Sequence, residues 1–134
     1  MTGAHAWVDD ALHRQDWREI EQFLGTIVDK APEFGYLTEI VRSVIASGRS
    51  EELAGCTSMH DLVVVPRPVP DPPYGVVMVR APNSLRRAPR AGNVLIEEQS
   101  TTGHNDIIER PAADAVALFW RFMIEKFGIA PRPH

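Results

Sequence analysis

The residues best suited to chemistry in this chain lie together, at the point where an apolar run ends and polar groups begin. Apolar residues 94–96 lead into Glu97 and Glu98, and a turn follows that is crowded with hydroxyl, amide and imidazole groups. An imidazole can carry a proton near neutral pH, and a nearby carboxylate can orient it. The candidate catalytic residues are therefore His104, Asp106 and Glu97. The candidate ligand-binding residues are Gln99, Thr101, Thr102 and Asn105.

The same turn also has a purely structural interpretation. Side chains of Thr, Asn and Asp commonly bond backbone amides in tight turns, and Gly103 allows a sharp bend here. Under this interpretation the polar groups hold the turn rather than a ligand. If the turn is a site, we expect a concave pocket between the edge of the sheet and the last helix, lined by these side chains.

Glu97 and Glu98 cannot form a catalytic pair with one another. Neighbouring residues of a strand point to opposite faces, so Glu97 shares a face with Leu95 and Gln99, and Glu98 lies on the other. One of the two carboxylates should face the same side as Leu95 and lie near the helical layer, and by this alternation it would be Glu97. A carboxylate that points inward needs a hydrogen-bond or charge partner, because burial of an unpaired charge is costly. A solvated strand end, a structural ion pair and a functional role all remain open.

A basic cluster surrounds the loop that follows residue 80. It comprises Arg80, Arg86, Arg87 and Arg90. Such a cluster is either a solvated run of charge or a contact surface, and Arg86, Arg87 and Arg90 are our candidate partner contacts. Nucleic-acid binding ranks last among the functions considered, because the loop has no interleaved aromatic residues for base stacking and the whole chain is acidic.

Several familiar chemical motifs are missing from the sequence. It has no phosphate-binding glycine loop, paired-cysteine motif, serine-nucleophile elbow or zinc-protease helix, and we expect no cofactor. We also expect no metal site, because His60-Asp61 and His104 with Asp106 should fall at opposite ends of the sheet. The single Cys56 excludes an internal disulfide and is expected to be a small, partly buried apolar residue.

Hydrophobic periodicity predicts helices at both ends of the chain. Apolar residues recur every three or four positions within 4–31, after a short first piece near Trp7–His13, and again from Phe34 to Ile45. Asp16 followed by Glu19 has the pattern of a capping box. Residues 112–127 form the most apolar helix, which begins at a proline and ends at a glycine.

The middle of the chain changes to the pattern of strands. We predict strands at Leu62–Val65, Val76–Arg80 and Val94–Glu98, with Ile107-Ile108 as a short fourth strand or a loop anchor. A short helical turn could span Ser50–Ala54. The proline-dense stretch after the first strand is expected to be a long hairpin connection.

Strands that follow one another without crossover helices predict an antiparallel meander. The predicted fold is therefore α+β, with two N-terminal helices, a three- to four-stranded mainly antiparallel sheet, and a C-terminal helix packed on one face. We predict a single domain over residues 1–134.

The composition is that of an ordinary globular protein, with 44% hydrophobic and 24% charged residues and a net charge of −4. Residues 1–60 carry ten acidic against five basic side chains, which favours a partner with a basic face. Charges within 112–127 exclude a membrane span there, and we expect no signal peptide at the N-terminus. We expect a cytoplasmic protein, and the richness in Ala, Arg and Pro with only two lysines suggests a bacterial source.

Two hypotheses about function follow. The first is a non-enzymatic protein-interaction or regulatory module, such as an antitoxin, an immunity-type inhibitor or an accessory subunit. A homodimer through the C-terminal helix accompanies it, because that helix is apolar on nearly every side. The alternative is a small enzyme or ligand-binding protein that uses the polar loop Glu97–Asp106, with His104 as proton carrier.

Overall fold

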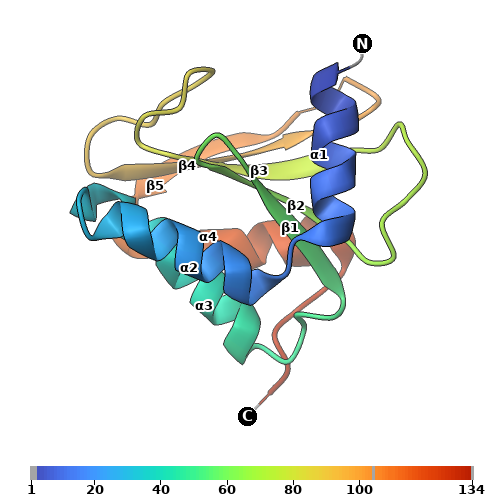
Figure 1. The fold of residues 1–134 in the computed structure, drawn as a ribbon, viewed down its shortest axis with the longest axis horizontal. Helices are drawn as coiled ribbons and strands as arrows, with labels where there is room; N and C mark the ends of the chain where they lie inside the picture. Colours follow the sequence, from blue (N-terminus) through green and yellow to red (C-terminus); the bar gives the residue numbers. More distant parts are fainter. Residues whose placement is uncertain (1–2, 104, 134) are drawn as a thin grey trace.

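The computed structural model describes residues 3–103 and 105–133. Within them the chain forms helices at both ends of the sequence and a sheet between them (Figure 1). The helices are α1 (Gly3–Arg14), α2 (Trp17–Val28), α3 (Gly35–Ala46) and α4 (Ala115–Phe122), with helical turns at Pro32–Phe34, Ala112–Asp114 and Met123–Phe127. The strands are β1 (Leu53–Ser58), β2 (Asp61–Pro66), β3 (Val76–Arg80), β4 (Asn93–Gln99) and β5 (Ile107–Pro111).

The sheet is an antiparallel meander in which every strand pairs with its neighbours in the sequence, in the order β1-β2-β3-β4-β5. This confirms the predicted α+β class and the predicted direction of the strands. The strand count was too low, however. Ile107-Ile108 belongs to a full fifth strand, and β1 precedes the strand that we had taken as the first.

Strand β1 was missed because its sequence, Leu-Ala-Gly-Cys-Thr-Ser, has little of the β-branched character of a strand. Two side chains form hydrogen bonds with backbone groups on the outer edge of β1. The indole Nε1 of Trp17 donates to the carbonyl of Leu53 at 2.9 Å, and Gln15 accepts from the amide of Thr57 at 3.3 Å. Contacts from the helical end of the chain therefore help to hold this segment as a strand.

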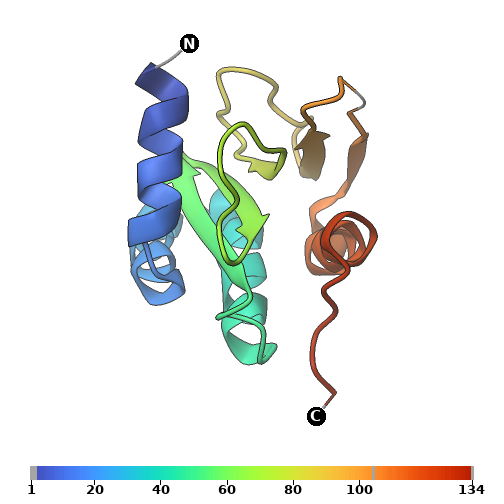
Figure 2. The same ribbon diagram turned by 90° about the vertical axis from the view of Figure 1, so that its right-hand side faces the viewer.

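Three helices, α2, α3 and α4, cover one face of the sheet (Figure 2). Their apolar side chains form one core with those side chains of the strands that point toward them. The fully buried members of this core include Leu24, Leu37, Ile40, Ile96 and Phe119. The predicted capping box is confirmed, because Asp16 accepts from the amide of Glu19 and the Glu19 carboxylate accepts from the amide of Asp16.

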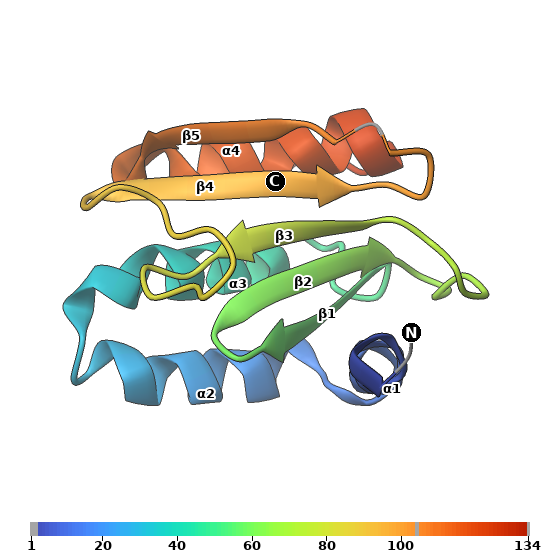
Figure 3. The same ribbon diagram turned by 90° about the horizontal axis from the view of Figure 1, so that it is seen from above.

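The first helix lies on the opposite face, which the sequence did not predict. Ala11 and Leu12 of α1 pack against Ala54 and Cys56 of β1 and against Val63 of β2, all of which point away from the three-helix layer. Figure 3 shows α1 end-on beside the outer strand β1, so this helix covers only the β1 side of the face. Among the described residues, no helix covers the neighbouring part of the face, over β3 and β4.

No helix in the described part of the chain has the length and apolar character needed to cross a membrane.

Candidate functional site

A groove lies on the face of the sheet that α2, α3 and α4 leave uncovered. We call it the sheet groove; its cavity volume is about 700 Å³. One side is formed by α1 and the loop between β2 and β3, and another by residues 81–92, which we call the arginine loop. Figure 3 looks onto this face, with the arginine loop folded over one end of β2 and β3. The groove is therefore framed by loops on a rigid sheet, as is typical of binding sites.

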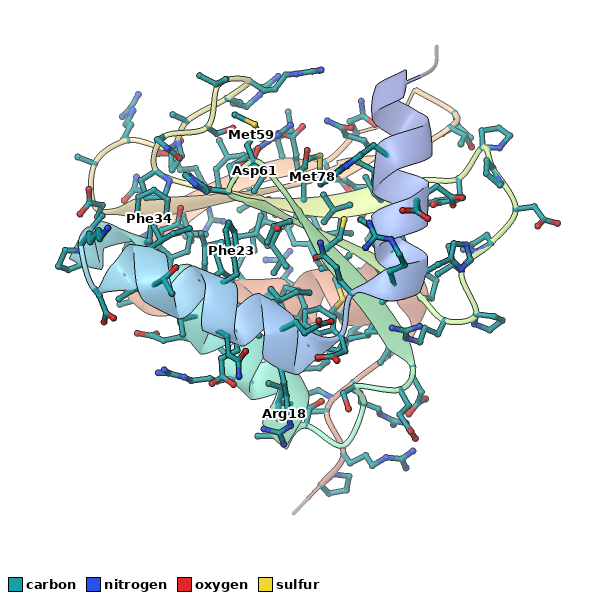
Figure 4. The ribbon with its side chains drawn as sticks, in the orientation of Figure 1. Arg18, Phe23, Phe34, Met59, Asp61 and Met78 are labelled. Atoms are coloured by element: carbon teal, nitrogen blue, oxygen red, sulfur yellow. The ribbon has the colours of Figure 1, made fainter. Side chains whose placement is uncertain are left out.

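The floor of the groove is apolar. Val63 of β2 and Val76 and Met78 of β3 line it, and they share the face that carries the α1 contacts. Figure 4 shows Met78 on the upper side of the sheet, together with Met59 and Asp61, whereas Phe23 and Phe34 lie toward α2. A pocket with an apolar floor and a few convergent polar groups is the usual form of a binding site.

Three buried charged residues, the ionic triad, lie at the end of this floor nearest the arginine loop. Arg80 donates from Nη1 to Asp61 at 2.7 Å and from Nε to Glu97 at 2.7 Å. The exposed fractions are 3% for Arg80, 6% for Asp61 and 4% for Glu97. Although burial works against it, these bonds raise the pKa of Arg80. The inward carboxylate at Glu97 is thus a partner in a buried ion pair.

The triad also fixes the start of the arginine loop. Asp61 accepts from the backbone amide of Ala81 at 2.7 Å and from the Ser84 hydroxyl at 2.9 Å. At the other end of the loop, Glu109 accepts from the amide of Arg90 and from the side chain of Asn93, both at 2.8 Å. The Asn93 bond, then the Arg90 bond, lower the pKa of Glu109. Carboxylates of the sheet therefore hold both ends of the loop.

The rim of the groove exposes large apolar side chains. Met59, in the turn between β1 and β2, is 72% exposed, and Leu85 of the arginine loop is 85% exposed. Both line the groove, as does the neighbouring Arg86. A cluster of exposed apolar side chains beside a concave surface is typical of an interaction site.

The far end of the groove carries a second polar group. The Tyr74 hydroxyl, beside the prolines Pro72 and Pro73, donates to Asp9 of α1 at 2.5 Å. Burial and this bond raise the pKa of Tyr74. The bond joins α1 to the proline-rich loop, and it keeps this wall of the groove in place.

The structure distributes the sequence-predicted site residues over both faces of the sheet. Gln99 and Thr101 line the sheet groove. Glu97 points to the same face but is held in the ionic triad and does not line the groove. This groove lies on the face opposite α4, so its place differs from the expected pocket between the sheet edge and the last helix.

The rest of the polar turn is occupied with bonds of its own. Asn105 accepts from the amide of Ser100 at 2.9 Å, and the Ser100 and Thr102 hydroxyls are 3.0 Å apart. Asp106 pairs with Lys126, which also lies 3.3 Å from Glu98 on the helical side of the sheet. Glu98 is therefore the carboxylate that faces the helices, and the expectation that the carboxylate on the Leu95 side would do so was wrong. His104 lies outside the described residues, so its role as proton carrier remains a prediction.

The predicted arginine cluster divides into two environments. Arg80 belongs to the buried triad, whereas Arg86, Arg87 and Arg90 are exposed on the arginine loop. The Nε of Arg87 lies 3.9 Å from Glu97, so part of its charge faces the triad. Arg86 has no ion pair or hydrogen bond with any described residue. Because Arg86 also lines the groove, its guanidinium is available to a partner there.

Two other reactive side chains are His60 and Cys56. His60, in the turn between β1 and β2, lines the groove and is hydrogen-bonded through Nδ1 to the side chain of Asn83. Cys56 is buried beneath α1, and its burial raises the pKa of its thiol to about 12. Among the described residues, no three His, Cys, Asp or Glu side chains are grouped so that they could hold a metal ion.

Sequence reasoning missed the triad as a unit. Asp61 was considered only as a metal ligand and Arg80 only as part of a surface cluster. The available signal was strand parity: Asp61 alternates with Val63, Arg80 with Met78, and each continues an otherwise apolar face. Placing the two side by side requires the register between β2 and β3, and a long connection separates these strands.

No protein-family model matches this chain, and neither a curated protein nor a solved structure was found that matches it.

Proposed function

We propose that this protein is a non-enzymatic interaction module and that a segment of a partner protein docks in the sheet groove. The observation that supports this most strongly is the exposure of Met59 and Leu85 on the rim of a groove with an apolar floor. Two large apolar side chains beside a concave surface gain free energy when a partner covers them. Regulators, immunity-type inhibitors and accessory subunits all act by such docking.

The state of the buried carboxylates supports a binding role over a catalytic one. A general base must be free to take a proton from a bound substrate. Asp61 and Glu97 are instead each bonded to the Arg80 guanidinium at 2.7 Å. Both carboxylates already accept hydrogen bonds from a buried guanidinium, so the triad is better suited to holding the groove in shape than to proton transfer.

Site-specific cross-linking tests the proposal. A photoreactive amino acid at Leu85 should give a discrete adduct in the producing cell, and the adduct should disappear when Met59 is also replaced by Glu. The matched control position is Ile124, a 50% exposed apolar residue after α4, where we expect at most an adduct between two copies of this chain. Identical adducts from both positions, or none from position 85, would contradict docking in the groove.

The second candidate function is the binding of a small molecule, and the size of the groove favours it. A volume of about 700 Å³ lies within the range of ligand pockets, roughly 300–1,000 Å³. Gln99 and Thr101 would supply polar contacts from the wall. Native mass spectrometry of gently purified protein should then show added mass, which Met78→Trp, a change that fills the floor, should remove.

A homodimer through the C-terminal helix remains part of the proposal. Leu118, Trp120 and Phe122 of α4 are buried within the chain, which leaves the half-exposed Ile124 as an apolar contact for a second copy. Light scattering that shows a monomer at high concentration would remove the dimer and leave the groove proposal intact. A cytoplasmic, bacterial setting is likewise proposed, and the single cysteine and the low lysine content support it.

A further inference from the structure

The charges around the sheet groove are unevenly satisfied. Asp61 already accepts bonds from Arg80, Ala81 and Ser84, and Glu97 accepts one from Arg80 with Arg87 nearby. At the far end, Asp9 accepts from the Tyr74 hydroxyl. The carboxylates at the groove are thus supplied with donors by the protein itself.

The cationic side chains at the groove are not all paired in the same way. Arg86 is exposed, lines the groove, and has no ion pair within the described part of the chain. Within the triad the single guanidinium of Arg80 is bonded to two carboxylates, and the Nε of Arg87 lies 3.9 Å from Glu97. Among the described residues, the charged group that is left without a partner at this end of the groove is therefore the guanidinium of Arg86.

The end of the groove that carries Arg86 adjoins the apolar floor. Met78 and Arg80 are two residues apart on β3 and point to the same face, and Leu85 and Arg86 are adjacent on the loop above. An occupant that covers the floor consequently brings its neighbouring groups to Arg86. Charge complementarity of this kind governs the choice of partner and the rate of encounter.

We infer that the partner segment seated in the sheet groove is acidic, with one carboxylate on Arg86 and an adjacent large apolar side chain on Val63, Val76 and Met78. This inference rests on the proposed docking function. It identifies the partner by its chemistry: an acidic stretch that contains Leu, Ile, Phe or Trp next to Asp or Glu.

Selection from a library of random peptides displayed on phage tests the inference. Peptides that bind the full chain should be enriched in Asp or Glu beside a large apolar residue. Arg86→Glu should lower the affinity for the selected peptides by about tenfold, a size expected for a reversed interfacial charge. Peptides with Lys in place of their acidic residues should bind the Arg86→Glu variant better than the unaltered protein.

The control variant is Arg18→Glu, an equal change of charge at an exposed residue of α2 on the helical side of the molecule (Figure 4). It should leave peptide affinity unchanged. Two results would contradict an acidic partner and leave docking in the groove supported. In the first, the selected peptides are neutral or basic. In the second, Arg86→Glu leaves their affinity unchanged while Leu85→Glu abolishes binding. Binding that neither Leu85→Glu nor Arg86→Glu weakens overturns both the inference and the proposed function.

Discussion

Arg80 and Glu97 lie on neighbouring antiparallel strands and share a buried ion pair, with Nε 2.7 Å from a carboxylate oxygen. The direct cross-strand partner of Glu97 is Met78, so the guanidinium reaches diagonally along the sheet. The same guanidinium bonds Asp61 on β2. Charged groups therefore join three strands on the face opposite α2, α3 and α4, next to an apolar floor that a partner can cover.

Removal of the cation should be the most damaging change to the triad. Arg80→Met leaves two buried carboxylates without their shared partner, and breaking a buried ion pair costs about 3–5 kcal/mol. We expect urea denaturation to show a loss of this size. Arg86→Met, at an exposed position, should change the free energy of unfolding by less than about 0.5 kcal/mol. An equally small effect at Arg80 would show that the triad does not hold the strands.

Two glycine substitutions should change the stability of the fold in opposite directions. A Cβ at Gly55 would lie 2.5 Å from the ring of Trp17, so Gly55→Ala should destabilise the fold by about 1–3 kcal/mol through overpacking. A Cβ at Gly25, within α2, meets nothing within 4 Å. Gly25→Ala should stabilise by about 0.5–1 kcal/mol, because alanine is the better helix former. The melting temperatures of both variants test these two predictions. A Gly55→Ala protein as stable as the unaltered protein would contradict the packing of α2 on β1.

Cys56 should be unreactive in the folded protein. Burial raises the pKa of its thiol to about 12, and the thiolate is the reactive form. Labelling with iodoacetamide at pH 8 should therefore occur only after a denaturant is added. Labelling of the native protein at the rate of a free cysteine would mean that α1 does not cover this part of the sheet.

The anchor of the arginine loop should depend on pH. Bonds from Asn93 and Arg90 lower the pKa of Glu109 in the folded state below the unfolded value of about 4.3. Its contribution to stability is thus present above the unfolded pKa and is lost as the pH falls through the folded pKa. The difference in melting temperature between the unaltered protein and Glu109→Gln should shrink on acidification through this window. A difference in melting temperature that stays constant into strong acid would show that the charged Glu109 carboxylate does not stabilise the loop.

The sequence carried enough information for the architecture but not for all of its parts. Periodicity predicted α3 and α4 because their apolar residues face a single core, and an apolar run with residues on both faces of the sheet predicted β3. Strand β1 escaped because Ala54, Gly55 and Cys56 have weak strand propensity, and the Trp17 ring occupies the space that a side chain at Gly55 would fill. Tertiary packing overrode the local preference there.

The candidate site was predicted less well than the fold. The polar turn after β4 drew attention because of its composition, yet Asn105 and Asp106 bond the turn and Lys126. The groove depends on the register of β2 and β3 and on the side to which α1 folds. Neither follows from periodicity, because both are set by contacts between residues far apart in the chain.

The most direct test of docking in the sheet groove is the affinity for the partner captured from Leu85, measured by titration calorimetry. Leu85→Glu should weaken the affinity by about tenfold or more, as expected for a central apolar contact, whereas Ile124→Glu should leave it unchanged. Equal dissociation constants for the unaltered protein and Leu85→Glu, or a loss confined to Ile124→Glu, would contradict docking in the groove.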